Sequence, residues 1–210
     1  MKLIFRTLLV ITLFFFETAT ATEADCNRYQ DALHQLFQEE YSIAEEMTSK
    51  CPASIKLQKL KIRLLIAKQE TELATKALEN LINIHQQVSD VHYFSGIAWS
   101  RLARQVSIFS KSRYYKKATL AFIRAAHLEP DNPLFLLEQA KAYGQPDSLG
   151  GNQTLQAGVV AKLSAMSPTY SFLAKMDLAQ NKRDYQQLEQ LADQVVKYDP
   201  TNYLIVERAA

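Results

Sequence analysis

Apolar residues recur every three to four positions along most of this chain, and this spacing predicts helices. Between Tyr185 and Val195 they occupy one face of a 3.6-residue period, and Leu57, Leu60 and Leu64 show the same spacing earlier. The six prolines lie where one periodic stretch ends or the next begins, and a proline inside a helix costs about 3 kcal/mol. The 210 residues are therefore predicted to be all-α, with prolines marking helix ends.

Small and aromatic residues stand at fixed spacings on successive predicted helices. The clearest examples are Gly96, Trp99, Ala118, Phe122, Ala125 and Pro130. Small side chains let the two helices of a hairpin approach closely, and large ones fill the space between hairpins. This pattern resembles the tetratricopeptide (TPR) repeat, a helical hairpin of about 34 residues. The resemblance implies an all-α, right-handed solenoid of about five TPR-like hairpins, whose default activity is binding.

The chain is expected to divide into four segments. Residues 1–21 have the cationic start, the run of about ten apolar residues and the small-residue cleavage site of a secretory signal peptide. An uncleaved anchor is the alternative. Residues 22–90 are predicted to form degenerate repeat hairpins, and residues 91–202 to form hairpins that match the repeat well. Residues 203–210 are expected to begin a C-terminal capping helix.

A turn with two glycines precedes one of the predicted second helices. Its residues are Tyr143, Pro146, Leu149, Gly150, Gly151 and Asn152. Together with the stretches Trp99–Arg104 and Arg113–Pro130, this turn is similar to that of a group of exported TPR proteins of Gram-negative bacteria, although Gly144-Gln145 departs from their pattern. The resemblance implies a periplasmic or secreted protein. From the residues themselves we expect glycines that accept positive φ and an asparagine that caps the next helix.

Residues that could carry chemistry are few. In an exported protein, the two cysteines Cys26 and Cys51 suggest one disulfide, and two free buried thiols are the alternative. The four histidines lie on different predicted helices and show no metal-ligand spacing, so neither a metal nor another cofactor is expected. No arrangement of nucleophile and base is recognisable. The sequence therefore favours a protein that is not an enzyme.

Charge is distributed unevenly along the chain. Between Val91 and Leu128 there is no Asp or Glu, but there are seven cations: Arg101, Arg104, Lys111, Arg113, Lys116, Lys117 and Arg124. Such a region can attract an acidic partner, or its cations can pair with carboxylates on neighbouring hairpins. Both interpretations remain open at this point. A smaller stripe of Lys56, Lys59 and Arg63 is expected to be a solvated helix face.

Residues 105–113 are expected to be an insertion between the two helices of the third hairpin, with Tyr114 and Tyr115 exposed beside it. The predicted partner-binding residues are Arg101, Arg104, Lys111, Arg113, Tyr114, Tyr115, Lys116 and Lys117. They suggest a non-catalytic scaffold that binds a protein or peptide, an acidic one included, on a concave and centrally basic surface. Nucleic acid and stable membrane insertion are not expected for an exported chain. A small-ligand carrier or transporter-associated component is the alternative, and it would need a closed apolar pocket.

Overall fold

Helices follow one another throughout residues 29–49 and 54–198, which are the residues that the computed structural model describes. They are α2 (Tyr29–Phe37), α3 (Tyr41–Ser49), α4 (Ile55–Ala67), α5 (Thr71–Ile84), α6 (Ser89–Gln105), α7 (Ile108–Leu128), α8 (Pro133–Tyr143), the short 3-10 helix η1 (Asp147–Leu149), α9 (Gln153–Met166), α10 (Pro168–Lys182) and α11 (Tyr185–Tyr198). No strand occurs within these ranges. The predicted all-α class is confirmed.

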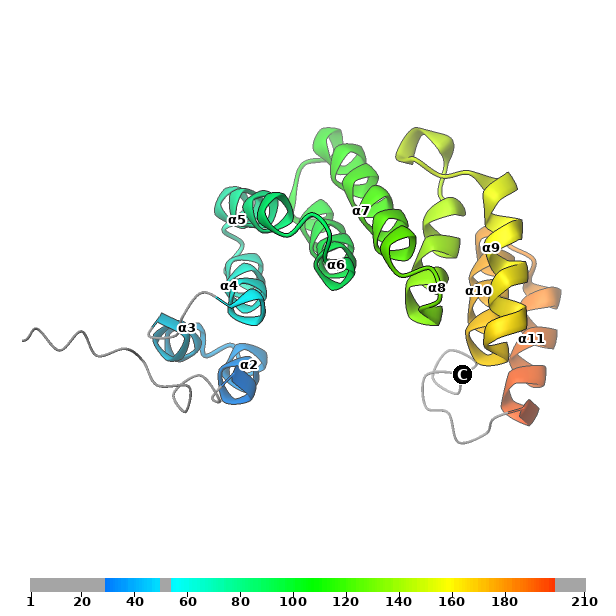
Figure 1. Cartoon of the computed structure of the whole chain (residues 1–210), viewed down its shortest axis with the longest axis horizontal. Coiled ribbons are helices and arrows are strands. Elements are labelled where there is room, and N and C mark those ends of the chain that lie inside the picture. The colour runs from blue at the N-terminus through cyan, green and yellow to red at the C-terminus, as the bar shows by residue number, and fades with distance from the viewer. Residues whose placement is uncertain (1–28, 50–53, 199–210) are drawn as a thin grey trace, which may run out of the picture.

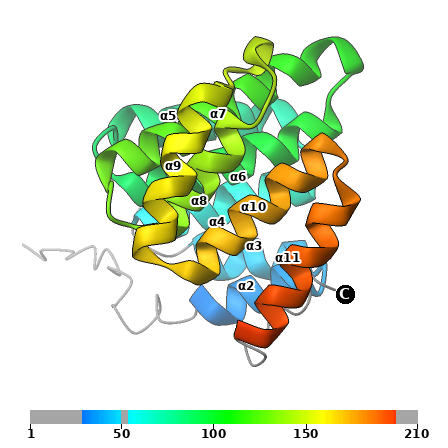
Figure 2. The ribbon, with the colours of Figure 1, turned by 90° about the vertical axis from the view of Figure 1, so that its right-hand side faces the viewer.

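Consecutive helices pair as hairpins, α2 with α3, α4 with α5, α6 with α7, α8 with α9 and α10 with α11. Figure 1 shows the hairpins following an arch, with α4 and α6 on its inner side and α5 and α7 on its outer side. Figure 2 views the stack from its C-terminal end, with α10 and α11 nearest the viewer. We call the surface formed by the first helices α2, α4, α6, α8 and α10 the inner face. The predicted solenoid of helical hairpins is confirmed.

The third hairpin shows why small residues stand at the repeat positions. Gly96 on α6 lies against the ring of Phe122 on α7, and a Cβ at Gly96 would be only 2.5 Å from the ring carbon Cε1. Ala118 and Ala125 are buried beside it, and Trp99, one turn further along α6, is buried against Tyr114 of the same helix α7. These residues pack as the repeat pattern predicts, since only short side chains leave room for such a close approach.

Helix ends are set by the expected capping chemistry. The side chain of Ser54 accepts a hydrogen bond from the Leu57 N–H, and that of Asn132 accepts one from the Leu134 N–H. Pro133 begins α8 and Pro168 begins α10, where a proline costs nothing because the first helical N–H groups have no partner in the helix.

The turn between α8 and α9 requires both of its glycines. Gly150 has φ of 88°, in the left-handed region. At Gly151 a Cβ would lie 1.6 Å from the backbone oxygen of Gln145. The Asn152 side chain accepts a hydrogen bond from the Leu155 N–H at 3.1 Å and so caps α9. The predicted positive φ is confirmed for Gly150 and the predicted cap for Asn152, whereas Gly151 is required for space and not for positive φ.

Residues 105–113 do not form the expected insertion between α6 and α7, because most of them are helical. Helix α6 continues to Gln105, only Val106 and Ser107 connect the helices, and α7 begins at Ile108. The physical reason is that this segment contains neither glycine nor proline, so nothing in it ends a helix. The extra residues therefore lengthen α6 and α7, which have 17 and 21 residues.

Several predictions concern residues outside the described ranges. The signal peptide of residues 1–21, the Cys26–Cys51 disulfide and the capping helix of residues 203–210 all lie there and stay predictions. Within residues 29–49 and 54–198, no helix combines the length and apolarity that crossing a bilayer would need.

Two glycines near and within α9 give a matched test of this packing. We expect Gly151→Ala to lower the free energy of unfolding by about 2 kcal/mol or more, because the methyl group would collide with the Gln145 carbonyl. Gly158→Ala should instead raise it by about 0.5–1 kcal/mol, since that helical position has open space around it. Urea unfolding followed by circular dichroism measures both. Equal effects of the two changes would contradict the turn geometry.

Candidate binding site on the inner face

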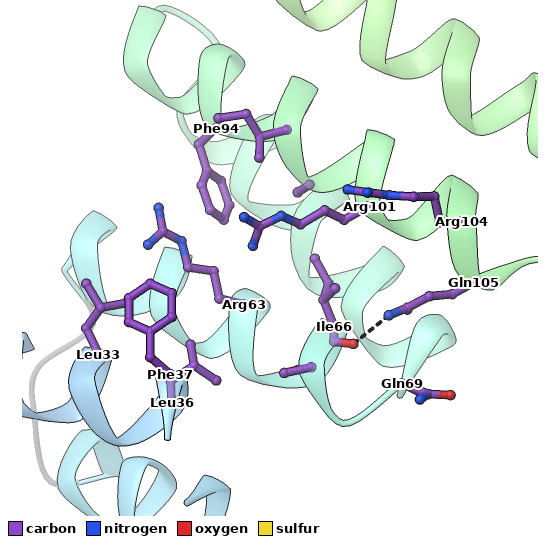
Figure 3. Close-up of a pocket in the computed structure, with 13 residues that line it drawn as sticks. Leu33, Leu36, Phe37, Arg63, Ile66, Gln69, Phe94, Arg101, Arg104 and Gln105 are labelled. Carbon is purple, nitrogen blue, oxygen red and sulfur yellow. Dashed lines mark hydrogen bonds between the residues drawn. The ribbon is translucent and has the colours of Figure 1, made fainter. Parts of the chain in front are cut away.

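A cavity of about 440 Å³ opens on the inner face, between the first helices of the first three hairpins. Its walls come from α2, α4 and α6, and Figure 3 shows their side chains converging on it. The residues that α6 contributes recur every three to four positions and so lie along one side of the helix: Phe94, Ile97, Ala98, Arg101, Arg104 and Gln105. We call this space the inner cavity.

Three arginines from two hairpins meet in the inner cavity. Arg63 comes from α4, and Arg101 and Arg104 come from α6. Figure 3 shows the Arg63 and Arg101 side chains both running toward the Phe94 ring, with their guanidinium groups on either side of it in this view. Partial burial lowers the pKa of Arg101 below its ordinary value, and the positive charges of Arg63 and Arg104 lower it further. The like charges of the three guanidinium groups thus repel one another.

No carboxylate of the described residues forms an ion pair with any of these three arginines. The Arg63 guanidinium instead lies 5.6 Å from the centre of the Phe94 ring. The cavity is therefore a place where positive charge accumulates without a counter-ion from the described part of the protein. An arginine fork without a partner is suited to a carboxylate or another planar anion.

Apart from the amides of Gln69 and Gln105, apolar side chains form the rest of the walls. Leu33 and Phe37 of α2 face Phe94 and Ile97 of α6, and the Phe37 side chain is 71% exposed. The Gln105 side chain donates a hydrogen bond of 2.8 Å to the Ile66 carbonyl, drawn as a dashed line in Figure 3, and so joins the ends of α6 and α4. A ligand in this cavity would meet apolar surface and guanidinium groups together.

The inner face changes character toward α8 and α10. Burial raises the pKa of Tyr93 on α6, and the nearby Glu138, Tyr170 and Asp90 raise it further. Lys141 forms an ion pair of 2.6 Å with Glu138. This half of the inner face therefore carries tyrosines and internally paired charges, whereas the half around the inner cavity carries uncompensated positive charge.

The structure separates the predicted partner-binding residues. Arg101 and Arg104 line the inner cavity. The other predicted residues all lie on the outer helix α7, away from that cavity: Lys111, Arg113, Tyr114, Tyr115, Lys116 and Lys117. The prediction of one continuous surface is therefore wrong, because these neighbours in sequence occupy two surfaces.

The expectation that Tyr114 is exposed is wrong. Its side chain is 7% exposed, its ring centre lies 5.6 Å from that of Trp99, and its hydroxyl is 3.2 Å from the Thr75 hydroxyl. Because α7 already begins at Ile108, Tyr114 falls on the same buried side of the helix as Ala118. Tyr115 is half-buried.

Few of the cations between Val91 and Leu128 form ion pairs with carboxylates on neighbouring hairpins. Within the described ranges, Lys117 is the one cation of that region with a carboxylate partner, Glu79 at 2.6 Å. Its ammonium also lies 4.4 Å from the centre of the Trp99 ring. Arg124 donates a hydrogen bond to the Gln87 side chain, which carries no charge. The excess of positive charge between Val91 and Leu128 is thus largely retained.

The stripe of Lys56, Lys59 and Arg63 is not a plain solvated face. Lys59 is 8% exposed, donates a hydrogen bond to the Asp90 carbonyl at 3.1 Å and forms an ion pair with the Asp90 carboxylate. Arg63 lines the inner cavity, and only Lys56 is freely exposed. The signal that could have revealed this is their position on a first helix, where one side contacts the next hairpin.

Comparison with solved structures identifies the fold. The crystal structure of a thermophilic TPR protein from Thermus thermophilus superposes with a TM-score of 0.61 at 13% sequence identity, covering 88% of this chain and 96% of that one. No protein-family model matches the chain, and no curated protein matches it. The chain thus has the fold of a TPR protein.

The described residues were compared with the requirements for a metal site, and the cavity lining with the requirements for catalysis. Within residues 29–49 and 54–198, no three residues of the types His, Cys, Asp and Glu come together in a way that could hold a metal ion. The side chains around the inner cavity are apolar, amide or guanidinium, and these bind and orient a ligand but supply no nucleophile or base.

The Lys59–Asp90 pair holds two walls of the cavity together and can be tested directly. We expect Asp90→Ala to lower the free energy of unfolding by about 1–3 kcal/mol, because the buried ammonium of Lys59 loses its counter-ion. Adding Lys59→Met should restore most of that loss, since the buried charge is then removed. A double-mutant cycle by urea unfolding measures the coupling, and simple additivity of the two changes would contradict the pairing.

Proposed function

We propose that the protein is a non-catalytic scaffold that binds a segment of another protein on its inner face. The inner cavity would receive an acidic part of that segment. The observation that carries the proposal is the meeting of Arg63, Arg101 and Arg104 in one cavity without an ion-pair partner among the described residues. A carboxylate placed between them would gain charge-assisted hydrogen bonds and relieve the mutual repulsion of the guanidinium groups.

The apolar walls narrow the chemistry of the bound segment. Phe37, Leu33 and Ile97 would contact a large apolar side chain adjacent to the acidic one. Such a buried anchor supplies most of the affinity in many interfaces. Charge complementarity mainly determines which partner binds and how fast it associates. We therefore infer a segment in which acidic and apolar residues alternate closely, bound with an affinity that falls as salt concentration rises.

The exported location expected from residues 1–21 belongs to the same proposal. An exported scaffold would meet proteins of the periplasm or of the cell surface, and nucleic acid would not be its partner. The charge between Val91 and Leu128 then serves protein recognition at Arg101 and Arg104.

A small-ligand carrier is the second candidate. The inner cavity, at about 440 Å³, falls within the range of about 300–1,000 Å³ that small-molecule sites occupy. Its ligand would be amphipathic, with an anionic group for the arginines and an apolar part for Phe37 and Phe94. Native mass spectrometry of the purified protein distinguishes the two candidates, because a carrier should retain a bound mass that reversal of the arginine charges removes.

Photo-crosslinking in cells tests the scaffold proposal. A photoreactive amino acid at Phe37, whose exposed side chain borders the cavity, should capture one reproducible protein. The double reversal R63E/R101E should reduce that capture on the order of tenfold or more, because the acidic segment would then face carboxylates. Mass spectrometry identifies the captured protein.

The matched control is K56E/K61E, which reverses two exposed charges on the same wall helix α4 outside the cavity. Capture by this control should stay near the wild-type level, and thermal unfolding should show that both variants fold. Equal capture by R63E/R101E and wild type would refute the proposal, as would an equal loss in both variants.

A further inference from the structure

The end of the third hairpin projects two large apolar side chains into solvent. Ile108 is 72% exposed and Phe109 is 92% exposed, and both lie in the first turn of α7. Figure 1 shows this end of α7 at the outer edge of the arch, away from the inner face. We call residues 106–113 the hairpin tip. It covers the connection between α6 and α7 and the first residues of α7.

Val106 of the hairpin tip packs against the core, but the exposed side chains of Ile108 and Phe109 contribute little to it. Phe109 is the most exposed large apolar residue of the described ranges, so its ring packs against little else. Single exposed apolar residues are common on soluble proteins. Two adjacent ones at a projecting helix end, however, form a contact surface rather than part of the core.

Positive charge surrounds this apolar pair. Phe109, Arg113 and Lys116 stand at intervals of four and three residues and so share one exposed side of α7. Leu120 continues the same side of the helix and is also exposed. Neither Arg113 nor Lys116 has a carboxylate partner among the described residues, and α7 itself contains no Asp or Glu.

Carboxylates near the tip are already paired, with one exception. The start of α5 lies against the end of α6, where the Thr71 hydroxyl contacts the Gln105 side chain. There, Glu70 pairs with Lys68 and Glu72 pairs with Lys76. On the other side, η1 carries the exposed Asp147. The tip therefore keeps a net positive charge next to its apolar residues.

We propose that the hairpin tip docks the protein on the surface of an anionic lipid bilayer. Ile108 and Phe109 would enter the boundary between headgroups and acyl chains, while Arg113 and Lys116 would lie among the anionic headgroups. This combination of exposed large apolar residues with flanking cations is what interfacial binding requires, and neither element alone gives stable attachment. The inner face would remain free to bind its partner.

The test is vesicle co-sedimentation with the purified full chain, whose N-terminus is read by mass spectrometry. Vesicles of phosphatidylcholine with about 30% phosphatidylglycerol should bind the protein, and vesicles of phosphatidylcholine alone should bind it far more weakly. I108S/F109S should weaken binding to the anionic vesicles on the order of tenfold or more. R113Q/K116Q should weaken it roughly fivefold for each charge removed.

Two matched variants control for general effects. I43S/I84S removes two exposed apolar residues elsewhere, and K56Q/K61Q removes two exposed charges elsewhere. Both should bind the anionic vesicles like wild type. Since all variants share one N-terminus, differences between them report the hairpin tip even if residues 1–21 are retained and bind lipid themselves.

Two results would overturn the proposal. One is wild-type binding of I108S/F109S to the anionic vesicles, and the other is equal binding of wild type to neutral and anionic vesicles. If I108S/F109S binds the vesicles like wild type but changes the oligomeric mass measured by sedimentation equilibrium, a second copy of the chain, and not a bilayer, covers the tip.

Discussion

The close approach of the two helices within each hairpin is the constraint on which this structure depends. In the third hairpin the absence of a side chain at Gly96 lets the ring of Phe122 lie against the α6 backbone. Ala118 and Ala125 keep α7 equally close along its length. With the pairs packed in this way, the first helices of successive hairpins come to lie side by side, and the inner face is the surface that they form (Figure 1).

The arrangement of the inner face also explains why arginines that are far apart in sequence line one cavity. Arg63 and Arg101 belong to different hairpins, and they meet only because α4 and α6 are neighbours on that face. Holding these like charges close to each other without a carboxylate costs stability, which the burial of Ile62, Leu78 and Trp99 in the neighbouring core offsets. Retaining such a cluster is understandable if an anion from outside completes it. The unpaired cations of α7 lie on the outer side and belong to a different surface.

Much of the fold can be predicted from particular residues, because TPR packing depends on local patterns. Gly96 and Trp99, the cap at Asn152 and the glycine turn before it all act within a few residues of their position.

The site can be predicted less well, because it depends on which side of each helix meets the next hairpin. The burial of Tyr114 follows only once α7 is known to begin at Ile108, and a stripe of charges does not reveal that Arg63 faces α6. Sequence proximity groups Arg101 with Lys117, although the helix geometry places them on opposite sides of the hairpin.

A structure of the protein in complex with the partner captured from cells would test the acidic-segment proposal most directly. We expect a partner carboxylate within hydrogen-bond distance of the Arg63 or Arg101 guanidinium, with an adjacent apolar side chain against Phe37 or Ile97. A partner bound only to the outer helices α5 and α7, with the inner cavity left to solvent, would contradict it.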